Sequence, residues 1–456
     1  MNNNITGGVI WKQLLLFFFP IWFGTFFQQL YNTADAVIVG NFVGKGALAA
    51  VGTTAVVQNL LVGFFVGVAS GASVVISQYY GARQGAQVQR AVHTAMAMAL
   101  LGGVGIMLIG LAASRWALSI MNTPADVMED AVLYLRICFL GMVPSLIYNM
   151  GTGILRAVGD SKRPLYFLIC ASLTNIVLDM VLVAILGMGV AGAALATVAS
   201  QCVSAGMTVM SLTHTTACYR FVPAYLQLDK EMVEKIVRIG LPAGLQSVMY
   251  SLSNSVVQAS INSFGTDVVA AYTAYGKIDS IFWMTMNSFG LSITTFVGQN
   301  FGAGQYDRVK KGVRQCALMA FVATGLLMAV TLAFGSALFR LFVQDAPVIQ
   351  QGVEILHYVV PFWPTYVLIE ILSGSARGAG DSLIPMIMTS IGVCVTRILW
   401  VLTVVATVWH TLIGALACYP VSWSLTSLFF LAYYLQGGWL RRRIRVREAA
   451  QTEQPA

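Results

Sequence analysis

The stretch Leu14-Leu15-Leu16-Phe17-Phe18-Phe19 would be apolar on every face of a helix, and it lies in the first of many long apolar runs. A strand that crosses a membrane as part of a barrel alternates apolar and polar residues over about ten positions, and this stretch does not. A helix that is apolar all round lies in lipid or inside a bundle. The stretch therefore predicts an all-α chain whose helices cross a membrane.

The composition of the whole chain supports this prediction. Hydrophobic residues make up 57% of the 456 residues and charged residues only 10%, whereas a soluble globular chain carries about 25% charged residues. This is too little charge to solvate a soluble surface of this size, which excludes a cytosolic enzyme, a disordered scaffold and a disulfide-rich secreted module. The seven cysteines contain no CxxC pair and indicate neither a disulfide framework nor a zinc site.

Twelve apolar runs are long enough to cross the hydrocarbon layer, which takes about 20 helical residues. They lie approximately at 13–39, 50–77, 92–114, 131–152, 164–187, 191–213, 236–261, 270–297, 315–339, 350–373, 384–408 and 412–436. Lys and Arg gather in cytoplasmic connections. With the N-terminus inside, only Lys45, Arg115 and Arg340 fall in outer loops. We therefore expect both termini in the cytoplasm.

An internal duplication recurs at a spacing of 221 residues. Gly153–Ser161 (GILRAVGDS) corresponds to Gly374–Ser382 (GSARGAGDS), and Gln78–Gln84 corresponds to Gln299–Gln305. Each copy holds six spans, an even number, so both copies enter the membrane in the same direction as a parallel repeat. The prediction is an N-lobe at 1–213 (spans 1–6), a cytoplasmic linker at 214–235, a C-lobe at 236–436 (spans 7–12) and a basic cytoplasmic tail at 437–456.

Two acids inside the first-lobe spans are the most informative charges. An Asp at a helix centre costs about 2.5–3.5 kcal/mol on insertion scales. Asp35 in span 1 maps to Val256, and Asp179 in span 5 maps to Trp400, so the second lobe tolerates apolar residues at both places. The fold therefore does not require these acids, and we expect them to be functional.

Neighbouring polar residues complete a candidate cation site. Asn175 and Asp179 are spaced i, i+4 on one helix face, and Thr197 in span 6 could add a hydroxyl group. Oxygen ligands of this kind suit a proton or a hard cation such as Na⁺. The alternative is that these groups only form hydrogen bonds between helices. Pro20 lies in the same span as Asp35 and permits a bend there.

The C-lobe spans contain a second set of ionisable residues. Lys277 and Asp279 are spaced i, i+2 and do not face each other. Arg397 could pair with Glu370 across spans 10 and 11, either as a fixed structural salt bridge or as a pair that takes part in gating. The sequence leaves both roles open.

Two further patterns concern packing. Gly63, Gly67 and Gly71 form a ladder of small residues on span 2, which favours close contact with another helix. Asp229 is expected to cap a short amphipathic helix at the end of the linker.

No pattern for catalysis was found. Gly44-Lys45-Gly46 lacks the upstream glycine and the following Ser or Thr of a phosphate loop. The four histidines are far apart, and no metal pair or nucleophile–base array is present in the sequence. We therefore expect no enzymatic activity and no cofactor, with transport energy supplied by an ion gradient.

Several motifs resemble the MATE (multidrug and toxic compound extrusion) family of transporters. Gln28–Gly40 (QQLYNTADAVIVG) looks like the first-helix signature of that family, and Ala47–Gly52 (ALAAVG) continues it. The loops Arg156–Asp160 (RAVGD) and Gln299–Gly304 (QNFGAG) are also similar. The similarity covers about residues 10–438 and is closest to the DinF-like prokaryotic branch, which has an acid on the first helix and Asn-x-x-x-Asp on the fifth.

The resemblance implies a twelve-helix, two-lobe exporter of organic cations in the bacterial cytoplasmic (inner) membrane, driven by entry of H⁺ or Na⁺. It implies a cation site formed by Asp35, Asn175, Asp179 and Thr197, with Gln28, Tyr31 and Asn149 at polar positions around it. Span 7 departs from the NorM-like pattern because it has no acid, only Ser255 and Gln258.

The expected partners are small amphipathic cations and membrane lipids, without nucleic acid, and the protein is expected to be a monomer. One alternative is a lipid-linked oligosaccharide or lipid flippase of the same superfamily, which the acidic first-lobe site disfavours. Another is a membrane polyprenyl transferase, which would need a DDxxD run that the sequence lacks.

Overall fold

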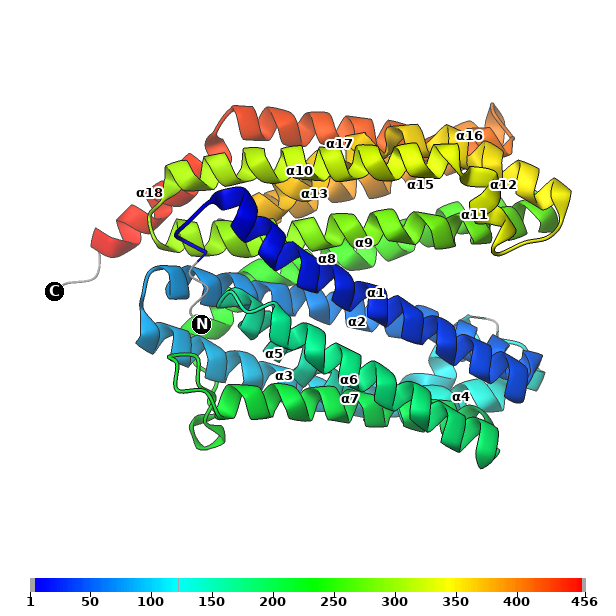
Figure 1. The fold of residues 1–456 in the computed structure, drawn as a ribbon, viewed down its shortest axis with the longest axis horizontal. Coiled ribbons are helices and arrows are strands. Elements are labelled where there is room, and N and C mark those ends of the chain that lie inside the picture. The colour runs from blue at the N-terminus through cyan, green and yellow to red at the C-terminus, as the bar shows by residue number, and fades with distance from the viewer. Residues whose placement is uncertain (1–4, 122, 453–456) are drawn as a thin grey trace. The chain divides into compact units, whose positions relative to one another are not determined.

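The computed structural model describes residues 5–121 and 123–452. Within these residues every regular element is a helix (Figure 1). The first six predicted spans correspond to α1 (Ile10–Phe42), α2 (Lys45–Gly81), α3 (Gly85–Ile120), α4 (Ala125–Leu140) with α5 (Met142–Ala157), α6 (Lys162–Asp179) with the π-helical segment Met180–Ile185, and α7 (Gly189–Thr213).

The linker contains one 3₁₀ turn, Pro223–Tyr225, and the six C-lobe spans follow it. These are α8 (Lys230–Asn262), α9 (Thr266–Gly302), α10 (Tyr306–Ala333) with α11 (Gly335–Arg340), α12 (Ala346–Val359) with α13 (Trp363–Gly378), α14 (Leu383–Thr389) with α15 (Thr396–Trp400), and α16 (Leu412–Leu416) with α17 (Cys418–Leu435). A 3₁₀ turn at Val360–Phe362 joins α12 to α13, and π-helical segments at Ser390–Val395 and Val401–Val405 flank α15. The basic tail forms α18 (Gly438–Thr452).

The described helices confirm the predicted class of an all-α polytopic membrane protein. Nine helical segments in this part of the chain are long and apolar enough to cross a membrane. A tenth is the pair α4–α5, which bends by 47° at Gly141. The other two predicted spans correspond to α8 and α9, which do not reach the same hydropathy. On α8, the polar residues Ser251, Asn254, Ser255 and Gln258 account for part of this difference.

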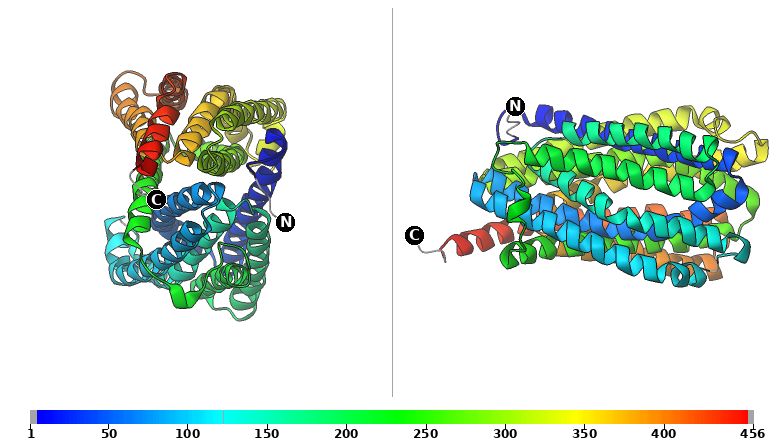
Figure 2. Two further views of the ribbon diagram at one scale, coloured as in Figure 1. Left: turned by 90° about the vertical axis from the view of Figure 1, so that its left-hand side faces the viewer. Right: turned by 90° about the horizontal axis from the view of Figure 1, so that it is seen from below.

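The chain forms two compact units, and each is a helical bundle (Figure 2). The first unit contains Phe19–Gly244, and the second contains Ile5–Phe18 together with the chain from Leu245 onward. One division lies inside α1 beside Pro20, and the other lies inside α8 beside Pro242. These units therefore divide within helices, and the lobe and linker bounds expected from the sequence stay a prediction.

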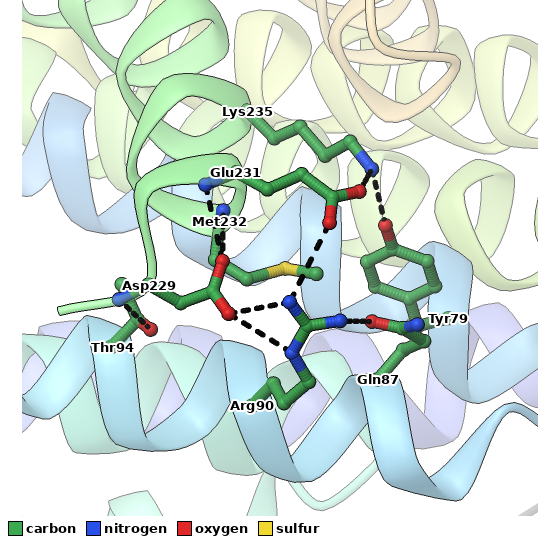
Figure 3. A network of polar contacts seen from close by, with 8 residues as sticks. All are labelled: Tyr79, Gln87, Arg90, Thr94, Asp229, Glu231, Met232 and Lys235. Atoms are coloured by element: carbon green, nitrogen blue, oxygen red, sulfur yellow. Dashed lines mark hydrogen bonds and ion pairs between the residues drawn. The ribbon is translucent and has the colours of Figure 1, made fainter. Parts of the chain in front are cut away.

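Asp229 joins the linker to the first unit (Figure 3). Its Oδ1 accepts hydrogen bonds from the backbone N–H groups of Glu231 (3.1 Å) and Met232 (3.2 Å), which confirms the predicted helix cap. Its Oδ2 accepts hydrogen bonds from Arg90 Nε (3.0 Å) and Nη2 (2.5 Å) on α3. The Arg90 guanidinium holds the pKa of Asp229 below its usual value. The helix that Asp229 caps is not short, because it continues as the 33-residue α8.

Lys235 and the first turns of α8 extend this attachment. The Nζ atom of Lys235 donates hydrogen bonds to the Tyr79 hydroxyl on α2 (2.7 Å) and to Glu231 Oε1 (2.5 Å). Met232, Ile236 and other apolar residues of these turns pack into a core cluster formed by the first unit. Charged and apolar contacts together hold the start of α8 on the N-lobe helices.

The predicted glycine ladder is confirmed at two of its members. Gly67 and Gly71 on α2 lie against the backbone of Gly244 and Gly240 on α8. A Cβ atom at Gly71 would come within 2.5 Å of the amide nitrogen of Gly240. The two helices therefore pack at a distance that only glycine permits.

Candidate functional site

The structure brings the two first-lobe acids together. Asp35 on α1 and Asp179 at the end of α6 lie close enough for their carboxyl groups to share a hydrogen bond. Asp179 is fully buried and Asp35 is half-buried. No donor among the described residues reaches either oxygen of Asp179 or the Oδ1 atom of Asp35. Two carboxylates this close repel each other unless a proton or a cation lies between them, so the pair is suited to binding one.

Asn175 is the second polar group of this site. Its side chain is 0% exposed, and neither the amide nitrogen nor the amide oxygen has a partner among the described residues. A buried polar group without a partner costs about 1–3 kcal/mol. One turn later, α6 ends at Asp179 and the chain continues as the π-helical segment Met180–Ile185. Such segments are frequent at functional sites.

Other side chains surround the acid pair. Tyr31 lies near Asp35 and Asp179, as we expected from the family pattern. Tyr134 on α4 also lies near Asp35, and it forms a hydrogen bond with Cys138. Neither Tyr134 nor Cys138 was predicted from the sequence, although their i, i+4 spacing on one helix face is a usable signal.

The structure gives local contacts to two other predicted site residues and leaves a third exposed. The Thr197 hydroxyl donates to the carbonyl oxygen of Ala193 (3.1 Å) in its own helix. The Asn149 amide donates to the carbonyl oxygen of Ser145 (2.8 Å), and Gln28 is exposed on α1. A role for Thr197, Asn149 and Gln28 at the cation site stays a prediction.

The first unit also contains a cavity of about 310 Å³. It is lined by Phe65, Val68, Ala69, Met98, Ala99, Leu101, Gly102, Leu146, Asn149, Met150, Leu228 and Val233. All of these residues except Asn149 are apolar, and neither Asp35 nor Asp179 is among them. This cavity is therefore not the ion site.

The second-lobe acids have partners that the sequence did not identify. Asp279 accepts hydrogen bonds from the Tyr275 hydroxyl (3.1 Å) and from the indole N–H groups of Trp283 (2.6 Å) and Trp363 (3.1 Å). Three donors fix this carboxylate in place. Lys277, two residues earlier, is exposed.

The predicted pairing of Arg397 with Glu370 is wrong. Glu370 forms its ion pair with Arg377 (3.7 Å), two turns further along α13, and accepts a hydrogen bond from the Tyr366 hydroxyl (3.2 Å). Arg397 instead donates from Nε to the Ser422 hydroxyl (3.1 Å) and from Nη1 to Asn254 Oδ1 (3.0 Å). Residues seven apart on a helix share a face, which explains how Arg377 reaches Glu370 without a second span.

Comparison with known proteins identifies the class of this bundle. The MatE family profile matches the chain twice, at residues 20–181 and 242–403. The two matched segments begin 222 residues apart, which confirms the internal repeat. Together they cover more than half of the chain.

The chain belongs to the MatE family, whose members are transporters and not enzymes. Two curated relatives from Bacillus subtilis (strain 168) are similar over nearly the whole chain. The probable multidrug resistance protein YoeA is 28% identical over 449 residues, covering 95% of each chain. The probable multidrug resistance protein YpnP is 28% identical over 439 residues, covering 96% of this chain and 97% of its own.

A solved structure shows the same fold. The outward-facing form of a multidrug resistance MATE family transporter of the MOP superfamily aligns with a TM-score of 0.90. The alignment covers 97% of this chain and 99% of that one, at 23% sequence identity. This likeness confirms the two-lobe helical fold.

Proposed function

We propose that this protein exports amphipathic organic cations by exchange for H⁺ or Na⁺, and that the Asp35–Asp179 pair binds the ion. The observation that carries this proposal is the meeting of two carboxyl groups in a site where no donor satisfies them. Export of drugs is also consistent with the names of the relatives YoeA and YpnP.

The exchange cycle follows from the charge of the pair. Facing outward, the two carboxylates take up an ion, which lowers the negative charge of the site and weakens its attraction for a cationic substrate. Facing inward, they release the ion, and the restored charge attracts the next substrate. The buried amide of Asn175 offers an oxygen to a metal cation and an N–H to a carboxylate, so it serves either ion.

The ligands that the structure describes are few for a metal ion. Among residues 5–121 and 123–452, no three His, Cys, Asp or Glu side chains gather as a metal site. A shared proton needs only the two carboxyl groups. This favours H⁺, while Na⁺ would have to complete its shell with Asn175, hydroxyl groups or water.

We also propose a bacterial inner-membrane location with both termini in the cytoplasm. Support comes from the distribution of Lys and Arg and from the basic helix α18. Arg443 on that helix binds Asp381 (3.1 Å), which also accepts a hydrogen bond from Tyr433 (2.7 Å). The start of the tail is thus attached to the second unit.

The test uses purified protein in liposomes with an imposed pH gradient or an imposed Na⁺ gradient and a cationic dye as substrate. We expect dye exchange in one of the two gradients, and its loss in the variants Asp35→Asn and Asp179→Asn. Asp126→Asn is the matched control, because Asp126 is an exposed acid at the start of α4 in the same unit. Exchange at the original rate in both site variants would refute the proposal.

A further inference from the structure

Arg397 has a buried guanidinium that is only partly satisfied. The residue is 1% exposed and lies on α15 in the second unit. Its Nε donates to Ser422 Oγ (3.1 Å) and its Nη1 donates to Asn254 Oδ1 (3.0 Å), while Nη2 has no partner among the described residues. Both partners are neutral. The Nη2 group is thus a buried donor without an acceptor, which costs about 1–3 kcal/mol.

A second buried donor lies beside it. Trp423 on α17 is 1% exposed, and its indole N–H has no acceptor among the described residues. The guanidinium carbon of Arg397 lies 5.7 Å from the centre of the Trp423 ring and 4.4 Å from the centre of the Tyr419 ring. Two unsatisfied donors on two helices therefore lie within one small region.

The acids of this unit are engaged elsewhere. Asp279 receives its three hydrogen bonds from Tyr275, Trp283 and Trp363. Glu370 is paired with Arg377. Asp279 interacts with Arg397 electrostatically, but neither acid accepts a hydrogen bond from it among the described residues, so Nη2 is left to donate to a group from outside the chain.

The surroundings suit an aromatic ligand that arrives from water. The Trp423 ring lies 5.8 Å from the ring of Tyr366 and 6.2 Å from that of Trp283. Asn254, which holds Nη1, is exposed on α8 next to the exposed Ser255. Polar groups are unfavourable against lipid, so these two exposed side chains are consistent with access from water.

The repeat places Arg397 on the span of the second lobe that corresponds to the Asp179 span of the first lobe. The π-helical segment that follows Asp179 begins at Met180, and its counterpart begins 221 residues later at Val401. Asp179 directly precedes Met180, and its counterpart Trp400 directly precedes Val401, with Arg397 three residues earlier. Near this point one copy of the repeat carries an acid and the other carries a cation.

We propose that Arg397 and Trp423 form a subsite that binds a carboxylate group of an aromatic substrate. The carboxylate would accept hydrogen bonds from Nη2 of Arg397 and from the Trp423 indole, with aromatic rings beside it. The proposal rests on the proposed export function and narrows its substrates to aromatic compounds that carry a carboxylate in addition to a positive charge.

The test measures dye binding to the detergent-purified protein by fluorescence polarisation, without any gradient. The probes are a rhodamine with a free carboxylate and the methyl ester of the same dye. Because a hydrogen bond to a charged group contributes about 1.5–3 kcal/mol, we expect Arg397→Gln and Trp423→Phe to weaken binding of the free acid about tenfold or more. Binding of the ester should stay within about twofold by the same relation.

Trp400→Phe is the matched control, because the Trp400 indole already donates to the carbonyl oxygen of Gly414 (2.9 Å). It should leave the ratio of the two affinities unchanged. Equal affinities for the acid and the ester in the unmodified protein, or an equal loss of both in Trp423→Phe, would overturn the subsite. Failure of the unmodified protein to bind either dye would count against the export function as well, whereas an unchanged acid affinity in both variants would refute the subsite alone.

Discussion

The close contact between α2 and α8 leads to a quantitative prediction about stability. We consider Gly71→Ala, because a Cβ atom there would lie 2.5 Å from the amide nitrogen of Gly240 and from the carbonyl oxygen of Ile236. Ordinary van der Waals contact begins at 3.4 Å, so the helices would have to separate by about 0.9 Å. Both neighbours are backbone atoms and cannot rotate away.

Two opposing effects decide the magnitude. Replacing Gly by Ala inside a helix gains about 1 kcal/mol from helix propensity. Overpacking a close contact costs about 1–3 kcal/mol, and a clash with rigid backbone belongs near the upper limit. The clash should therefore win, leaving Gly71→Ala about 1–2 kcal/mol less stable than the unmodified protein.

Gly206→Ala isolates the clash from the propensity effect. Gly206 is an exposed glycine of α7 in the same unit, and a Cβ atom there would meet nothing within 4 Å. We expect this variant to be stabilised by up to about 1 kcal/mol. For a domain of this size the apparent melting temperatures of the two variants should differ by about 5–10 °C in detergent at one scan rate. Equal melting temperatures would refute the close packing of α2 on α8.

Three further outcomes follow from other contacts. Arg90→Ala should speed proteolysis of the linker, whereas Glu234→Gln, at an exposed acid, should not. The pKa of Asp229 lies below the ordinary value of 3.8, so Asp229 is charged at neutral pH. The unmodified linker should therefore resist protease at neutral pH and lose protection as the pH falls below 3.8. Asp279→Asn should lower the free energy of unfolding by about 1–3 kcal/mol, since an amide offers one acceptor oxygen to three donors; an unchanged denaturation midpoint would contradict this. Arg308→Ala should accelerate hydrogen exchange around Gly7 and Gly8, whose carbonyl oxygens it binds at 2.8 and 2.9 Å, whereas Lys310→Ala, at an exposed lysine, is expected to have no such effect.

The sequence predicted the helices and the repeat because both are recorded locally. Hydropathy over about 20 residues is enough to identify a span, and the paired loops at 153–161 and 374–382 needed only comparison with each other. The bend between α4 and α5 was not predicted, because Gly141 in an apolar run is compatible with a straight or a broken helix.

The partners of buried charges were harder to predict than their positions. Asp35 and Asp179 were both identified as unusual, and their contact could be expected from the family pattern alone. The predicted partner of Glu370 was wrong because both Arg377 and Arg397 were candidates. Which arginine pairs with Glu370 depends on how far the side chains reach along α13 and on how the helices pack, and neither is recorded in the sequence. The division of α1 and α8 between the two units also depends on tertiary packing, which prolines at 20 and 242 permit but do not specify.

The duplication separates what belongs to the repeat from what belongs to each copy. The π-helical segments that begin at Met180 and Val401 occur at the repeat spacing, so this feature of the backbone is common to both halves. The charges near it are not common, since Asp179 directly precedes one segment, whereas Trp400 directly precedes the other and Arg397 lies three residues before Trp400. The proposed ion site in the first half and the proposed carboxylate subsite in the second therefore rest on their side chains alone, because the shared fold is compatible with either chemistry in either half.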